Sequence, residues 1–196
     1  MSPTDLVGKL NGLVPPEHHS YDPLRDPTIN QVVGELTQSF ANATKQQQTE
    51  ARAALTRQLR SALMGFAWEM AEEAVSCKSP ELVKQGLIAL AIDDGARDAR
   101  DDIIRMAPLF RSAQKLGLDA EKLFAEAADL TTNSYLKSEM YNFPLRKPEH
   151  RDFGKAFYIH ESNTKDGFRY VQDSLYPHFR RAIWREKLKR LFRRKK

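Results

Sequence analysis

The pattern of apolar positions along the chain predicts a mainly α-helical protein. The strongest signal runs from about Thr49 to Val75, where apolar residues keep the 3.6-residue period of a helix for about five turns. These positions are Leu55, Leu59, Ala62, Leu63, Phe66, Ala67, Met70 and Ala74. We expect one long helix here, with four side chains buried against the helices that follow: Leu59, Leu63, Phe66 and Met70.

A shorter helix is predicted before it. Apolar residues between Ile29 and Phe40 follow i, i+3, i+4, i+7, i+11 spacing, which places them on one stripe. Asp26 or Pro27 opens this helix, because proline is favoured in a first turn. Residues 42–48 (NATKQQQ) form a polar break, although the glutamines are equally compatible with the start of the next helix.

Three more short helices are predicted after the long one. Ser79 and Pro80 have the capping and first-turn character that begins a helix, and Gly86 within it indicates close approach of a neighbour. A charged turn (DDGARD, 93–98) leads to the next helix, in which Pro108 should produce a kink or a division. Gly117 is placed to end that helix in a left-handed conformation. A fifth helix follows, capped by Asp119 and extending to Leu130.

Two stretches in this region, LIALAIDDGARDARDDI and APLFRSAQKLGLD, carry a family resemblance. With them, residues 79–130 resemble the HEAT-type helical hairpins found in bacterial proteins of unassigned function. The resemblance implies a packing arrangement and a partner-binding surface, and no catalytic site. Because the repeat is not visible twice in the sequence, a compact helical bundle and a short helical-hairpin array both stay open.

The regions around this helical core, which we place at residues 27–132, have different compositions. Residues 1–26 include a proline-rich stretch and are predicted to form an extended arm. Residues 133–173 are rich in aromatic side chains, and we expect an irregular segment packed on the core. Within it, AFYIHE and GFRYVQ flank an Asp-Gly turn, so a small β-hairpin near residues 156–172 is an alternative.

Residues 174–196 are predicted to form a basic amphipathic C-terminal helix. Residues 180–196 contain ten Lys or Arg residues and one acid, Glu186, and so carry +9. Since the whole chain carries +5, residues 1–179 carry −4. The basic pI of about 9.3 therefore describes an appendage on a mildly acidic body, and it indicates an anionic partner.

The apolar residues of this tail fall on two faces. A proximal stripe from Leu175 to Ile183 is suited to packing on the body, whereas a distal stripe lies on roughly the opposite side: Trp184, Leu188, Leu191 and Phe192. The helix must therefore end or bend near Trp184, or project beyond the body. Basic residues that border an apolar stripe are typical of a helix lying in a membrane interface. The predicted contact residues are Arg181, Trp184, Arg185, Lys187, Leu188, Lys189, Arg190, Leu191, Phe192, Arg193 and Arg194.

The sequence favours a non-enzymatic interaction module attached by this helix to an anionic membrane surface. An acidic protein partner is the first alternative, and a tail that only aids solubility is another. Nucleic acid is a weaker one, because it accounts for the charge but leaves the apolar stripe without a role and because the body is acidic. The rival from another class is an enzyme with a site near the acidic turn and the aromatic segment.

Candidate chemistry within the body is sparse. Asp93, Asp94, Asp98, Asp101 and Asp102 supply the oxygen ligands that Mg²⁺ prefers. However, the DDGARD spacing is not the DDxxD of prenyl-diphosphate enzymes, and arginines interleave the acids. We interpret this segment as an N-terminal acidic turn that complements a helix dipole and forms ion pairs within its helix.

Histidine and cysteine give no metal or catalytic pattern. The five histidines (His18, His19, His150, His160 and His178) lack the i, i+4 spacing of a helical metal site, and the chain has no CxxC. His160 with Glu161, Tyr158 and Tyr170 is the one candidate acid/base set. Phosphate-binding glycine motifs are absent, so no cofactor is predicted.

The composition favours the cytoplasm, with peripheral attachment at the inner face of the membrane. The lone Cys77 has no disulfide partner within the chain and is expected to be a half-buried core residue. No stretch approaches the roughly 18 apolar residues of a membrane span. The first twenty residues do not have the pattern of a secretory signal.

Overall fold

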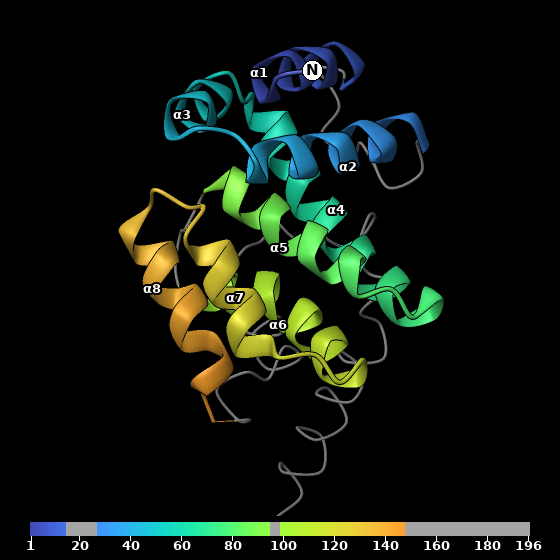
Figure 1. Ribbon diagram of the computed structural model, residues 1–196, viewed down its shortest axis with the longest axis vertical. Helices are drawn as coiled ribbons and strands as arrows, with labels where there is room; N and C mark the ends of the chain where they lie inside the picture. The colour runs from blue at the N-terminus through green and yellow to red at the C-terminus, as the bar shows by residue number, and fades with distance from the viewer. Residues whose placement is uncertain (15–26, 95–98, 148–196) are drawn as a thin grey trace, which may run out of the picture.

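The computed structural model describes residues 1–14, 27–94 and 99–147, and this part of the chain is a mainly α-helical bundle without strands (Figure 1). The prediction of the fold class is confirmed for these residues. None of their helices combines the length and apolarity needed to cross a membrane. The elements are α1 (Pro3–Leu13), α2 (Pro27–Ala41), α3 (Lys45–Ala53), α4 (Arg57–Cys77), α5 (Pro80–Asp93), α6 (Ala99–Lys115), α7 (Ala120–Ala128), α8 (Ser134–Asn142) and the short 3₁₀-helix η2 (Phe143–Leu145).

Helix α5 is the centre of the bundle. Every residue from Gly86 to Asp93 is buried, as expected because residues 86–92 are apolar on all sides of the helix. It packs most extensively on α4 and also contacts α2, α6 and α7. In Figure 1 it crosses the middle of the molecule, with α1 to α3 on one side and α6 to α8 on the other.

The predicted long helix is divided into α3 and α4. Thr56 begins α4, because its hydroxyl accepts a hydrogen bond from the Leu59 amide at 3.2 Å. Asn11 of α1 stabilises the break: its side chain donates to the Ala54 carbonyl at 2.8 Å and accepts from the Thr56 hydroxyl at 3.0 Å. The apolar period continues across the break, so periodicity alone did not reveal it. The predicted burial of the four apolar side chains on α4 is confirmed: Leu59, Leu63, Phe66 and Met70.

The extended arm predicted for residues 1–26 is wrong for residues 3–13, which form α1. Ser2 and Asp5 make a capping box: the Ser2 hydroxyl accepts from the Asp5 amide at 3.2 Å, and the Asp5 carboxylate accepts from the Ser2 amide at 3.1 Å. The hydrogen bonds from Ser2 also lower the pKa of Asp5. Leu6, Val7 and Leu10 are buried, and α1 packs on α2 and α3. The sequence Ser-Pro-x-Asp at residues 2–5 is typical of a helix start. The prediction of an extended arm relied instead on the prolines that follow α1.

Several predicted helix boundaries are confirmed. Pro27 and Pro80 occupy the first positions of α2 and α5. Gly117 follows α6 in the left-handed conformation with φ +68°, and the Asp119 carboxylate caps α7 by accepting from the Lys122 amide at 3.0 Å. These signals act within a few residues, so they do not depend on the rest of the fold.

Pro108 does not divide α6, which runs unbroken from Ala99 to Lys115. The residues around it are buried, including Met106, Leu109 and Ala113, and the helix packs on α4 and α5. The Ser112 hydroxyl lies within hydrogen-bonding distance of the Pro108 carbonyl, at 3.1 Å, and of the Ala71 carbonyl of α4. Tertiary packing thus holds the helix together at the point where proline removes one backbone donor.

The irregular structure predicted for residues 133–173 is wrong for residues 134–145, which form α8 and η2. The Asn133 side chain caps α8 by accepting from the amides of Tyr135 and Leu136, at 3.0 and 3.2 Å. Phe143 packs into the core, where its ring stacks on Phe124 at 5.8 Å between centroids and meets Phe110 edge-on at 5.8 Å. The predicted hairpin near residues 156–172 and the predicted helix over residues 174–196 lie outside the described residues.

The first prediction concerns the core face of α4. Phe66 is 3% exposed, so Phe66→Ala should open a cavity and lower the free energy of unfolding by about 3–5 kcal/mol. Chemical unfolding followed by circular dichroism measures the change. An unchanged unfolding midpoint would show that this face of α4 is not part of the core.

A second prediction tests the close approach of α4, α5 and α6 at Gly86. A Cβ added there would lie 2.5 Å from Leu109 Cδ2 and 3.1 Å from the Ala67 carbonyl oxygen. Gly86→Ala should therefore destabilise the protein by about 1–3 kcal/mol through overpacking. Gly8 of α1 is the matched control, since a Cβ there meets nothing within 4 Å, and Gly8→Ala should stabilise the helix by up to about 1 kcal/mol. Equal effects of the two changes on the melting temperature would contradict this packing.

Candidate functional site

The predicted tail contacts, Arg181 to Arg194, lie outside the described residues. All five histidines also lie outside them, as do Tyr158, Glu161 and Tyr170 of the acid/base hypothesis and Asp98 of the acidic turn. Nothing in the described residues therefore tests these groups as sites. What the structure does bring together is a cluster around the first two residues of the acidic turn, Asp93 and Asp94.

Asp93 and Asp94 lie at the C-terminal end of α5. Asp93 is its last residue, and Asp94 caps it in the left-handed conformation with φ 50°. The prediction of an N-terminal acidic turn with ion pairs inside one helix is therefore wrong for these two residues. A helix C-terminus leaves carbonyl groups without intrahelical donors and has a partial negative charge, so two carboxylates at this place require cations from elsewhere.

Arginines from two other helices compensate Asp93. The Asp93 carboxylate accepts from Arg105 Nη1 of α6 at 2.9 Å, and both side chains are almost completely buried. Arg60 of α4 lies with Nη1 3.9 Å from the other carboxylate oxygen and donates to the Asp93 carbonyl. The same arginine donates through Nη2 to the Arg52 carbonyl at 3.2 Å, which connects α4 to the end of α3.

Asp94 joins the end of α5 to the loop before α8. Its carboxylate accepts from the backbone amides of Thr132 and Asn133, both at 3.1 Å, and from the Thr132 hydroxyl. The Asn133 side chain donates back to the Asp94 carbonyl at 3.3 Å. One aspartate thus binds both Thr132 and Asn133.

Arg52 of α3 completes the cluster and is only 7% exposed. Its Nη2 donates to the Ala91 carbonyl at 3.1 Å and to the Leu130 carbonyl, and its guanidinium lies 4.8 Å from the centre of the Phe40 ring. Its Nε is 3.7 Å from the Asp94 carboxylate. Within the described part of the chain, Nε and Nη1 are buried without a hydrogen-bond acceptor. Burial lowers the pKa of Arg52, Asp94 opposes that change, and Arg60 adds to it.

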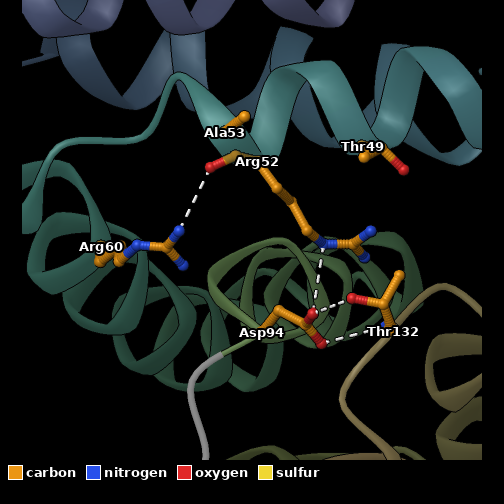
Figure 2. A pocket seen from close by; sticks show the side chains of 6 residues that line it. All are labelled: Thr49, Arg52, Ala53, Arg60, Asp94 and Thr132. Carbon is orange, nitrogen blue, oxygen red and sulfur yellow. Dashed lines mark hydrogen bonds and ion pairs between the residues drawn. The ribbon is translucent and has the colours of Figure 1, made fainter.

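Beside these groups lies a pocket of about 380 Å³. Figure 2 shows the Arg52 side chain extending from α3 toward Asp94 and Thr132, with Arg60 on another side. The lining residues are Thr49, Arg52, Ala53, Arg60, Asp94 and Thr132. We call the pocket the α5-end pocket and the surrounding charged groups (Arg52, Arg60, Asp93, Asp94 and Arg105) the α5-end cluster.

The α5-end cluster has the properties of a structural network. Its carboxylates receive donors from the protein, and its arginines bind the last carbonyls of α5, a recognised role for basic side chains at a helix C-terminus. No three His, Cys, Asp or Glu side chains are arranged to hold a metal ion in the part of the chain that the structure describes.

Cys77 is the last residue of α4 and is exposed, so the expectation of a half-buried core residue is wrong. The chain turns at Lys78, which has a left-handed conformation with φ 52°. The side chain consequently lies on the outer end of the helix. Periodicity did not show this, because it locates a residue around the helix axis but not relative to the edge of the bundle.

The sequence interpretation missed Arg52, Arg60 and Thr132 as members of one site. One signal was present: Arg52 lies three residues before Leu55 and seven before Leu59, so it falls on the apolar period of the predicted helix. A charged residue at a position of an apolar period indicates a buried partner. Its partners on α5 and in the loop before α8 are distant in sequence, so only the fold identifies them.

Comparisons with known proteins do not add to this description. No family model matches the chain, and no curated protein or solved structure matches it either. The interpretation of the cluster therefore depends on its own geometry.

The buried ion pair gives the next prediction. Arg105→Met leaves the Asp93 carboxylate in a buried position without its closest cation, so the free energy of unfolding should fall by about 3–5 kcal/mol. Adding Asp93→Asn should restore at least about 1 kcal/mol, because the uncompensated charge is then gone. Urea unfolding of the two single variants and the double variant measures this coupling. Strictly additive losses would show that the two side chains do not act as a pair.

Proposed function

We propose that this protein is a non-enzymatic helical interaction module whose basic C-terminal segment attaches it to an anionic membrane surface. The single observation that carries the proposal is the separation of charge along the chain. Residues 180–196 carry +9, whereas residues 1–179 carry −4. The attraction to anionic lipid therefore resides in one short segment.

The arrangement of arginines in the body supports this division. Arg52 and Arg105 are buried, and Arg60 is bound to two backbone carbonyls as well as lying near Asp93. These three cations are used to compensate and cap the end of α5. They are poorly placed to extend a basic surface for a large polyanion, so nucleic acid is a weaker candidate partner.

The apolar residues of the tail favour a membrane over a purely electrostatic partner. Trp184, Leu188 and Phe192 share a stripe with Leu191, bordered by basic residues. Each basic residue near an anionic leaflet contributes about 1 kcal/mol, and burial of the aromatic side chains adds a few more. Membrane attachment at the cytoplasmic inner face uses both properties of the segment, whereas a phosphate backbone uses only one.

The test separates charge from insertion. Changing Trp184, Leu188 and Phe192 together to Ser keeps all ten positive charges of residues 180–196 and removes most of the stripe. We expect this triple variant to sediment with vesicles containing anionic lipid at least about tenfold more weakly than the wild type, a loss of about 1.4 kcal/mol. Its affinity for double-stranded DNA should change much less.

A second variant, with Lys187, Lys189 and Arg190 all changed to Gln, serves as the control for charge. It should bind both vesicles and DNA more weakly, and moderate salt should reproduce the effect because exposed charges are screened within about 8–10 Å. If vesicle binding is insensitive to the serine changes, or if the wild type binds neutral and anionic vesicles equally poorly, the membrane is not the partner. Retained binding to an acidic protein would then favour that alternative.

A further inference from the structure

The α5-end pocket has an unequal distribution of charge. Two arginines line it, Arg52 and Arg60, against one carboxylate, Asp94. Asp93 lies next to it but is paired with the buried Arg105 at 2.9 Å. The described lining of the pocket therefore has one more arginine than carboxylate. The volume of the α5-end pocket, about 380 Å³, falls in the range of small-molecule sites.

Arg52 contributes a charge that is weakly screened. Because Nε and Nη1 are buried without a hydrogen-bond acceptor among the described residues, this guanidinium is only partly compensated by Asp94 at 3.7 Å. A buried charge acts over a longer distance than an exposed one, since water and salt screen it less. Burial lowers the pKa of Arg52 because it removes water from the charged guanidinium. An anion in the adjoining pocket would offset part of that free-energy cost.

Arg60 and the threonines supply the contacts themselves. The Arg60 side chain is 38% exposed, and its hydrogen bonds to the carbonyls of Asp93 and Arg52 leave further N–H groups of the guanidinium for a ligand. Thr49 donates its hydroxyl to the Lys45 carbonyl at 2.9 Å, and Thr132 donates its hydroxyl to Asp94. Both hydroxyl oxygens therefore keep acceptor capacity for a ligand, as does the Asp94 carboxylate.

We infer that the α5-end pocket binds a small organic acid that has a hydrogen-bond donor next to its carboxylate. The carboxylate contacts Arg60 and lies in the field of Arg52, and the neighbouring hydroxyl or ammonium group donates to Asp94 and Thr132. The lining offers a cation, Arg60, for the carboxylate and an anion beside it, Asp94, for the hydroxyl or ammonium donor. A phosphate dianion fits less well, because it would place a second negative charge beside Asp94 and has no comparable donor.

The experiment uses the full-length protein labelled with ¹⁵N and three probes of similar size: glycolate, glycine and acetate. Addition of glycolate or glycine should shift the amide signals of Ala53, Thr132 and Asn133, with a dissociation constant on the order of 1 mM. The tighter of the two should bind at least about threefold more tightly than acetate, which lacks the donor. Inorganic phosphate is titrated in parallel, and no vesicles are needed, so this test is independent of membrane attachment.

Ala53 and Ala54 offer a matched pair of variants, because both are exposed and only Ala53 lines the pocket. Ala53→Glu places a negative charge at the pocket without removing any described hydrogen bond, and it should weaken binding at least about tenfold. Ala54→Glu adds the same charge next to it and should leave the affinity within about twofold of the wild type. Arg60→Gln should weaken binding as well, with circular dichroism confirming that the helices persist.

Three results would overturn the inference. The first is that neither glycolate nor glycine shifts these amides at concentrations up to about 50 mM, well above the expected dissociation constant. The second is that Ala53→Glu and Ala54→Glu have equal effects. The third is that phosphate or acetate binds at least as tightly as the better donor-bearing probe, which would exclude the assigned class of ligand.

Discussion

Helix α5 ends inside the protein, and the rest of the bundle is arranged to satisfy that end. The residues from Gly86 to Asp93 are buried, so water is not freely available to the carbonyls of the last turn or to the Asp93 side chain. Unpaired charges in such a place are strongly unfavourable. Arginines Arg52, Arg60 and Arg105 bind the carbonyls and carboxylates directly, and the loop before α8 supplies amide donors to Asp94.

This requirement connects segments that are far apart in the sequence. Arg52 belongs to α3, Arg60 to α4 and Arg105 to α6, and the loop with Thr132 leads into α8. One helix end therefore contacts helices from both sides of the molecule (Figure 1). These contacts are polar, so they depend on the geometry of each donor and acceptor. The α5-end pocket lies beside this network and shares two of its arginines with it.

Local signals predicted helix boundaries where the responsible side chain acts on its own backbone. Pro27, Pro80, Gly117 and Asp119 all occupy the positions expected of them. The predictions that were wrong involve competition between a local signal and a distant one. The apolar period ran through Ala54–Thr56, but Asn11 of another helix binds the chain there and favours a break. Pro108 predicted a kink or a division, and the division does not occur because burial of the surrounding side chains holds α6 together.

The sequence by itself determined the helical class, most of the core side chains and the concentration of positive charge in residues 180–196, because periodicity and composition are properties of neighbouring residues. It did not determine which arginines meet which aspartates. The sequence predicted Asp93 and Asp94 as the start of an acidic turn. Only the tertiary structure decided that they lie at the end of α5 and pair with arginines of α3 and α6. The physical reason is that an ion pair depends on distance in space and on burial, and neither follows from spacing along the chain.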